Sequence, residues 1–260
     1  MCRLLGYLGQ PVLLDRLISQ SDHSLVVQSY QPKEMTAGLL NADGFGVGWY
    51  HATRETEPFI YRSTLPIWND VNLQSLNRYV ESGCVLASVR SATAGLATDL
   101  SNCQPFQYAS ILGLHNGFIQ DFRKTLYRPL RDRLGDVAYQ LIQGLTDSEH
   151  IFATAIDQLE TSANLTEALH RTLKLLIELG EKHQVSLSAN LILSDGNQLV
   201  ASRYAQGVPT PTLYYLENDP AFPQSILVAS EPLFEGNWKA LPDHCLLTVA
   251  HDLKPDITSI

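Results

Sequence analysis

The sequence has few cysteines, no run of basic residues and no long apolar segment. Its four cysteines, Cys2, Cys84, Cys103 and Cys245, are scattered and form no CxxC pair, which argues against a disulfide framework and for reduced thiols. The formal net charge of −9, without any Lys/Arg run, argues against nucleic acid or an anionic membrane surface as a partner. We therefore expect the partner to be a small molecule or a protein.

Apolar runs such as SILGLH and SILVAS fall far short of the roughly 20 residues that a membrane-spanning helix needs. The N-terminal segment has no basic stretch followed by an apolar core, so no signal peptide is indicated. We expect a cytoplasmic protein. With 45% hydrophobic residues and no linker, repeat or low-complexity tract, residues 1–260 are expected to form a single domain.

The pattern changes along the chain from strands to helices and back to strands. Before about Phe118, short β-rich segments bounded by Gly, Asn and Asp indicate strands: CRLLGYLG, GFGVGWY, CVLASVR and SILGLH. In the middle, TDSEHIFATAIDQL and NLTEALHRTLKLLIELGEKHQ have helical spacing, with Thr146 or Asp147 as N-cap of the first and Thr166 of the second. From Ser186, two apolar runs about an Asp-Gly-Asn turn predict a hairpin. This order favours sheets with helices on their outer faces.

Cys2 is the first residue along the chain whose side chain could take part in catalysis. A residue this small at the second position predicts removal of the initiator Met1, which leaves a thiol beside an α-amine of pKa about 7.7 to 8. Such an amine can accept the thiol proton, so nucleophile and base belong to one residue. The alternative is a small buried core thiol, which is the more common role of an isolated Cys.

Three further stretches carry unusual polar or glycine residues. In NADGFGVGWY the alternating glycines give one strand face without side chains, where another backbone or a ligand can lie close. In VRSATAG, Arg90 can pair with a carboxylate and Thr93 offers a hydroxyl, although an Arg at such a position, taken alone, is more often a solvated strand-end charge. In NCQPF and LHNGF, Asn116 and Gly117 follow a strand and could stabilise an oxyanion or simply form a turn.

Together with Cys2, the segments DGFGVGW, RSATAG, NCQPF, HNGF and TDSE resemble the class II glutamine amidotransferase domain, a member of the N-terminal nucleophile hydrolases. The resemblance covers most of the chain, and this order of motifs is very specific although each motif is weak. It implies an α+β fold, a four-layer α/β/β/α sandwich of two antiparallel sheets.

The resemblance also implies roles for individual residues. Cys2 would attack the δ-carbonyl of a glutamine-like substrate to form a γ-glutamyl thioester, with Asn116 and Gly117 as the oxyanion hole. Arg90, with Thr93 in support, would bind the substrate α-carboxylate, and Asp147 would pair with the α-ammonium group. The competing role of Asp147 is a helix N-cap, which needs no substrate. No cofactor and no metal are implied.

A finer likeness in QSYQPKEMTAGLLNADGFGVGWY, LPIWND and VLASVRSATAG is to the stand-alone amidohydrolases of ergothioneine biosynthesis. These remove glutamate from a γ-glutamyl-cysteine conjugate of hercynine, so a small-molecule γ-glutamyl substrate is expected. No acceptor domain for ammonia follows the glutaminase-like region, which favours hydrolysis. The alternatives are a glutaminase, a hydrolase of another γ-glutamyl compound, or a catalytically silent relative that binds an amino-acid-like ligand. The sequence leaves the oligomeric state open.

Overall fold

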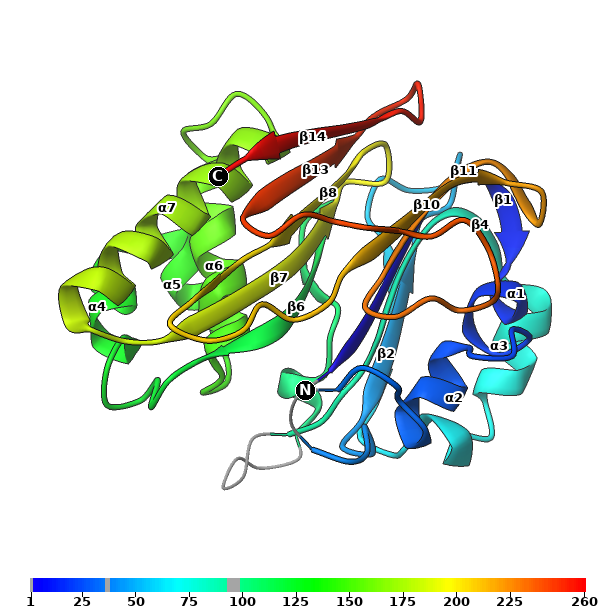
Figure 1. Ribbon diagram of the computed structural model, residues 1–260, viewed down its shortest axis with the longest axis horizontal. Helices are drawn as coiled ribbons and strands as arrows, with labels where there is room; N and C mark the ends of the chain where they lie inside the picture. The colour runs from blue at the N-terminus through cyan, green and yellow to red at the C-terminus, as the bar shows by residue number, and fades with distance from the viewer. Residues whose placement is uncertain (1, 36–37, 93–98) are drawn as a thin grey trace.

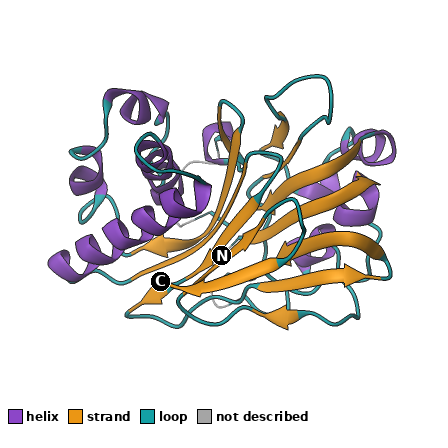
Figure 2. Cartoon of the chain, turned by 90° about the horizontal axis from the view of Figure 1, so that it is seen from above, coloured by secondary structure: helices purple, strands orange, loops and turns teal. Residues whose placement is uncertain are grey.

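The chain forms two antiparallel sheets packed face to face, with helices on both outer faces (Figure 1). The computed structural model describes residues 2–35, 38–92 and 99–260. Viewed from above, the strands of both sheets lie between helices on two opposite sides of the molecule (Figure 2). This arrangement confirms the predicted α+β fold with four layers.

The first sheet has the strand order β12-β10-β11-β1-β4-β2-β3, which brings strands from both halves of the chain together. Its strands are β1 (Arg3–Leu13), β2 (Phe45–Trp49), β3 (Phe59–Ser63), β4 (Glu81–Val89), β10 (Tyr214–Asp219), β11 (Phe222–Ala229) and β12 (Lys239–Ala240). Three short helices pack on its outer face: α1 (Leu14–Ile18), α2 (Leu25–Tyr30) and α3 (Leu73–Tyr79). Two 3-10 turns lie at η1 (Ile67–Asn69) and η2 (Leu100–Asn102).

The second sheet has the order β14-β13-β8-β7-β6-β5, with β9 paired to β7. Its strands are β5 (Phe106–Tyr108), β6 (Ile111–Ile119), β7 (Leu187–Ser194), β8 (Leu199–Arg203), β9 (Ala205–Gln206), β13 (Cys245–Val249) and β14 (Pro255–Ser259). Its outer layer contains α4 (Tyr127–Arg131), α5 (Asp136–Leu141), α6 (Asp147–Leu159) and α7 (Leu165–His183). The two long helices α6 and α7 are those predicted from helical spacing.

Side chains alternate between the two faces of each strand, and this alternation separates three apolar clusters. Leu4 on β1, Leu114 on β6 and Ile192 on β7 belong to the cluster between the sheets. Leu5, the next residue along β1, instead packs in the cluster beneath α1 to α3. Leu191, beside Ile192, belongs to the cluster beneath α6 and α7. A side chain at the end of an inner-facing row therefore points into the layer between the sheets.

Two details of the helices differ from expectation. The first part of the chain contains α1 to α3, which are too short to show a 3.6-residue period in the sequence. The N-cap of α7 is Asn164, whose Oδ1 accepts a hydrogen bond from the Glu167 N–H at 2.9 Å, so the prediction of Thr166 was wrong. Thr146 is the N-cap of α6, one of the two residues predicted for it.

The glycine face of β2 lies against another backbone. A Cβ on Gly46 would lie 2.2 Å from the carbonyl oxygen of Gln104. A Cβ on Gly48 would lie 2.7 Å from the side chain of Leu112 and 2.9 Å from that of Pro105. Of the two occupants that the sequence allowed, a backbone or a ligand, the structure shows the backbone before β5.

We expect Gly46→Ala to destabilise the protein, because the new methyl group meets a backbone carbonyl that cannot rotate away. Overpacking of this kind typically costs about 1–3 kcal/mol, measured as the free energy of unfolding in urea. Gly236→Ala is the matched control, since the nearest atom to its Cβ is a carboxylate oxygen of Asp219 at 3.3 Å. Equal stability of Gly46→Ala and wild type would contradict this packing.

Candidate active site

Three of the predicted site residues continue the inner-facing rows of side chains between the sheets. Cys2 lies one pleat beyond Leu4 and packs against the inter-sheet cluster. Asn116 lies one pleat beyond Leu114 on β6, directly opposite Asn190 of β7. Arg90 follows the last residue of β4, next to the β1 segment that begins at Arg3. The apolar layer between the sheets thus gives way to polar side chains at these three positions.

Gln104 links the two sheets on one side of this region. The Ser88 hydroxyl on β4 donates to the Gln104 carbonyl oxygen at 3.2 Å, and Ser88 pairs with Leu4 of β1. The Gln104 side chain in turn makes two hydrogen bonds to the backbone of His115 on β6, at 3.0 and 2.5 Å. Because His115 precedes Asn116 and Leu4 lies close to Cys2, the thiol and the amide belong to the same end of the molecule.

A second link runs along the other side. The side-chain amide of Asn190 donates to the carbonyl oxygens of Pro211 and Thr212, both at 3.1 Å. The Thr212 hydroxyl donates to the Ser230 carbonyl oxygen at 2.9 Å. The Ser230 hydroxyl accepts the Leu4 N–H, also at 2.9 Å. This chain of hydrogen bonds connects β7 to the start of β1, so Asn190 also belongs to this end.

The backbone of Cys2 is held by its neighbour. Arg3 Nε donates to the Cys2 carbonyl oxygen at 2.7 Å, and the half-buried thiol lies 4.0 Å from the Ser91 carbonyl oxygen. The three other cysteines, Cys84, Cys103 and Cys245, are buried, and burial raises the pKa of each thiol, to about 12 for Cys84 and about 11 for Cys245. Cys2 is therefore the most exposed thiol of the chain.

Arg3 itself is fully buried in an ion pair that the sequence analysis did not foresee. Its Nη1 lies 2.8 Å from Glu231 Oε1, and His23 Nε2 lies 2.7 Å from Glu231 Oε2. The backbone N–H groups of Lys33 and Glu34 also donate to this carboxylate. Burial alone would raise the pKa of Glu231, but these hydrogen bonds and the Arg3 charge lower it to about 2. A cation within an otherwise apolar strand sequence was the one signal available for this pair.

Asn116 and Gly117 lie inside β6 and not in a turn, so the turn alternative was wrong. The Asn116 side chain is 1% exposed, and neither its nitrogen nor its oxygen has a hydrogen-bond partner among the described residues. A Cβ on Gly117 would lie 2.0 Å from the Ser188 carbonyl oxygen of β7. Close approach of the two strands therefore requires glycine at position 117.

Arg90 is buried, with 6% of its surface exposed, which excludes the solvated strand-end role. Its Nη1 donates to the Asp43 carbonyl oxygen at 3.1 Å, and the Asp43 carboxylate accepts the Ala92 N–H at 2.7 Å. None of the ion pairs formed within the described residues includes Arg90. Thr93, its predicted partner in binding, lies outside the described residues.

Asp147 is the first residue of α6, and the capping role belongs to Thr146 before it. One carboxylate oxygen of Asp147 accepts the Ile119 N–H and the other accepts the Ser148 N–H, both at 2.8 Å. The half-buried carboxylate thus ties the end of β6 to α6. The Ser148 hydroxyl also donates to the Asp147 carboxylate, at 3.4 Å. A carboxylate has about four lone-pair positions, so these three bonds leave capacity for another donor.

His115 lies beneath this region, on the helix side of β6. Its Nδ1 lies 2.8 Å from the Ser148 hydroxyl, and its Nε2 lies 3.2 Å from the Ser188 carbonyl oxygen. Burial lowers the pKa of His115, against an opposing effect of Asp147. Both ring nitrogens are occupied, so His115 has a structural role at this position.

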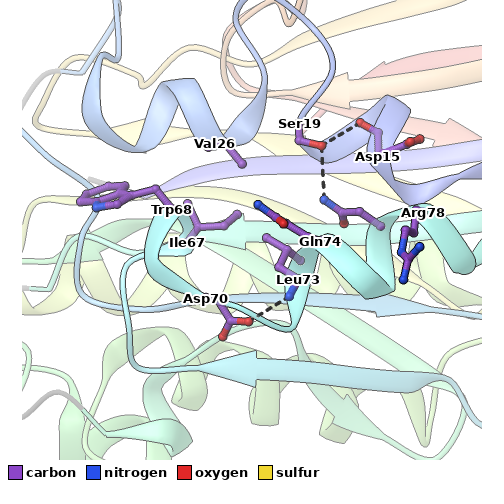
Figure 3. A pocket seen from close by; sticks show the side chains of 10 residues that line it. Asp15, Ser19, Val26, Ile67, Trp68, Asp70, Leu73, Gln74 and Arg78 are labelled. Atoms are coloured by element: carbon purple, nitrogen blue, oxygen red, sulfur yellow. Dashed lines mark hydrogen bonds between the residues drawn. The ribbon is translucent and has the colours of Figure 1, made fainter.

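A separate cavity of about 350 Å³ lies in the outer layer, between α1, α2, η1 and α3 (Figure 3). Ile67 and Trp68 of η1 and Leu73 of α3 contribute its apolar lining. None of the predicted site residues lines it. Within the described ranges, no three His, Cys, Asp or Glu side chains cluster as metal ligands would, and no helix has the length and apolar character of a transmembrane span.

Comparison with known proteins identifies the family. Residues 1–231 match the family model of class II glutamine amidotransferases. A probable glutamine amidotransferase, DUG3, of Saccharomyces cerevisiae is 31% identical over 96% of this chain and 82% of its own length. A γ-glutamyl-hercynylcysteine sulfoxide hydrolase of Mycobacterium tuberculosis is 30% identical over 96% of this chain and 93% of its own.

Among solved structures, a glutamine aminotransferase class-II domain protein from Silicibacter pomeroyi superposes with a TM-score of 0.73 and 28% identity. The match covers 100% of this chain and 99% of that one. The chain belongs to the class II glutamine amidotransferase family, and the names of its relatives support an amidohydrolase activity.

The ion pair between Arg3 and Glu231, beside Cys2, makes the free energy of unfolding depend on pH. The folded pKa of Glu231 is lowered to about 2 from 4.5, so its contribution is complete above about pH 4.5 and is lost as pH falls towards 2. A difference of this size corresponds to roughly 3 kcal/mol. We expect urea unfolding to show this loss between pH 5 and 2.5 in the wild type.

In Glu231→Gln we expect lower stability at pH 7 and a clearly smaller loss on acidification, because Arg3 is then buried without its partner. Asp243→Asn is the control, since Asp243 pairs with Arg203 but is 58% exposed and should behave as wild type within about 1 kcal/mol. An unchanged acid-dependent loss in Glu231→Gln would assign that loss to other carboxylates.

Proposed function

We propose that this protein hydrolyses a γ-glutamyl amide bond with the Cys2 thiol as nucleophile. The observation that carries the proposal is that Cys2, the most exposed thiol, shares one end of the inter-sheet layer with the Asn116 amide, which has no hydrogen-bond partner among the described residues. A nucleophile and an uncommitted hydrogen-bond donor are the two groups that acyl transfer needs.

In the proposed reaction, Met1 has been removed and the free α-amine of Cys2 accepts the thiol proton. The thiolate sulfur attacks the δ-carbonyl carbon, the carbon–nitrogen bond breaks, and the leaving amine takes up the proton. Water then attacks the resulting thioester, which regenerates the thiol and releases glutamate. The hydrogen bond from Arg3 to the Cys2 carbonyl fixes the orientation of this residue, which reduces the entropy lost on reaching the reactive geometry.

Asn116 and Gly117 are proposed to bind the negatively charged oxygen of the tetrahedral intermediate. A buried amide without a partner is costly for stability, typically about 1–3 kcal/mol, so its retention has an explanation if it bonds to a reacting atom. Its burial also strengthens that bond, because the surrounding dielectric is low.

Arg90 and Asp147 are proposed to bind the amino-acid head of the substrate. Arg90 is buried and has no carboxylate partner among the described residues, so a substrate α-carboxylate would supply the missing anion. Asp147 retains acceptor capacity for an ammonium group. Thr93 is proposed to support Arg90.

For the substrate itself we propose a γ-glutamyl-cysteine conjugate of hercynine. The support is the activity for which the mycobacterial relative is named, at 30% identity over 96% of this chain. Free glutamine is the second candidate, favoured by the name of the yeast relative. A third candidate, a silent relative that only binds an amino-acid-like ligand, would need no free amine at Cys2. Side-by-side turnover of glutamine and γ-glutamyl conjugates separates the first two.

A glutamine-analogue electrophile, diazo-oxo-norleucine, is expected to form one adduct on Cys2 of protein that has lost Met1. The other thiols are buried and have raised pKa values, so few are ionised at neutral pH. Mass spectrometry of the intact protein and its peptides measures both the loss of Met1 and the position of the label.

Cys2→Ala should abolish this label and glutamate release together, whereas Cys245→Ala should retain both. A label on another cysteine, or no label on protein with a free Cys2 amine, would remove the basis of the proposed chemistry. Retention of Met1 in native protein would favour the silent alternative.

Steady-state kinetics should distinguish the residue that stabilises the reacting oxygen from the residue that binds the substrate head. Asn116→Ala should lower kcat by roughly 10²–10³, the usual effect of losing one oxyanion donor, with a smaller change in KM. Arg90→Ala should chiefly raise KM, because it binds a part of the substrate that does not react. Thermal unfolding of Asn116→Ala should match or exceed wild type, since it removes an unpartnered amide. Parallel losses of kcat and of folded protein in both variants would favour structural roles.

A further inference from the structure

Four buried polar atoms without hydrogen-bond partners in the described part of the chain lie on one face of β6 and β7. They are both side-chain amide atoms of Asn116, the Oδ1 of Asn190 and the hydroxyl oxygen of Ser188. Asn116 and Asn190 are directly opposite, and Ser188 is the next inner-facing residue of β7. Asn190 and Ser188 have no solvent exposure. Buried polar groups are nearly always paired, so a cluster of four requires an explanation.

We propose that Ser188 and Asn190 form the subsite that holds the leaving group of the γ-glutamyl substrate. This inference rests on the proposed function, which places the scissile carbonyl between Cys2 and Asn116. It assigns to two residues outside the sequence motifs the recognition of the atoms beyond the scissile bond.

The strand order indicates on which side of Cys2 the leaving group of the substrate would lie. In the first sheet β1 lies between β4 and β11, and Arg90 follows β4. Ser230 follows β11, on the other side of β1, and is connected through Thr212 to Asn190. A substrate with its glutamyl head at Arg90 and its carbonyl at Cys2 therefore directs its leaving group towards β11 and β7. Ser188 and Asn190 lie on this second side.

The hydrogen-bonding groups of Asn190 and Ser188 define the chemical class of the leaving group. The Asn190 amide nitrogen is committed to Pro211 and Thr212, so the free atom Oδ1 can only accept. The N–H of a secondary γ-glutamyl amide supplies a donor for it. The Ser188 hydroxyl can donate to a carboxylate or carbonyl oxygen carried by the leaving amine. The leaving group is thus an amino acid or peptide-like amine with its own polar groups, since ammonia from glutamine is too small to reach both.

The segment between β9 and β10 covers this subsite. It contains Pro211 and Thr212, whose carbonyl oxygens accept from Asn190, and it begins at Gly207, which has a positive φ of 72°.

The test compares two substrates in the full-length, processed protein. For Ser188→Ala and Asn190→Ala, kcat/KM is measured with γ-glutamylalanine and with glutamine. We expect a fall of about tenfold or more for γ-glutamylalanine, the effect of one hydrogen bond to a polar partner, and less than about twofold for glutamine. Equal falls for the two substrates in both variants would overturn the inference, because a structural role affects both alike.

Ser202→Ala is the matched control. Ser202 is also a fully buried hydroxyl of the second sheet, but it accepts the Leu191 N–H and donates to the Ala189 carbonyl oxygen. Its loss should lower the unfolding temperature without changing the ratio of the two kcat/KM values. Ser188→Ala should leave the unfolding temperature equal or higher while changing that ratio.

Two further outcomes separate this inference from the proposed function. Wild-type protein that cleaves glutamine but not γ-glutamylalanine would overturn the leaving-group subsite and leave the Cys2 chemistry in place. Wild-type protein that cleaves neither, and takes no label at Cys2, would overturn the proposed function itself and the subsite with it.

Discussion

The buried ion pair between Arg3 and Glu231 is the constraint on which the site depends. Glu231 is bonded by three separate segments, which contribute Arg3, His23, and the adjacent residues Lys33 and Glu34. Arg3 also donates a hydrogen bond from Nε to the carbonyl oxygen of Cys2. These contacts hold the start of β1, which would otherwise fray. The Cys2 thiol points into the layer between the sheets. The pair contributes to placement more than to net stability, because burial of two charges costs much of what their attraction returns.

The sequence predicted the long helices, the principal strands and the four-layer arrangement, the last through resemblance and not through periodicity. Candidate residues were found because thiol, guanidinium and amide groups stood in an order typical of one family. Their proximity could not be predicted, since it depends on Gln104 and on the chain from Asn190 to Leu4, which join strands distant in sequence. The short helices α1 to α3 were not predicted, because five to seven residues are too few to show a helical period in the sequence. The single-domain assignment stays a prediction.

Asn116 and Gly117 show how one dipeptide can have different meanings. In isolation Asn-Gly favours a turn, but here both residues continue a strand. Glycine is needed because Ser188 approaches from the neighbouring strand, and the asparagine side chain is left without a hydrogen-bond partner among the described residues. Pairing between distant strands overrides the local preference, and the same pairing creates the uncommitted amide.

Strand β1 lies in the interior of its sheet, between β4 and β11, although it is the first strand of the chain. Its Leu5 pairs with Ala229, so the contacts that fix Cys2 join residues far apart in sequence. During synthesis the Cys2 thiol emerges from the ribosome long before β11 but acquires its surroundings only after β11 has been made. The chemistry proposed for Cys2 therefore has to wait until β11 has been made, and a chain that stopped before β11 would carry the thiol without the contacts that place it.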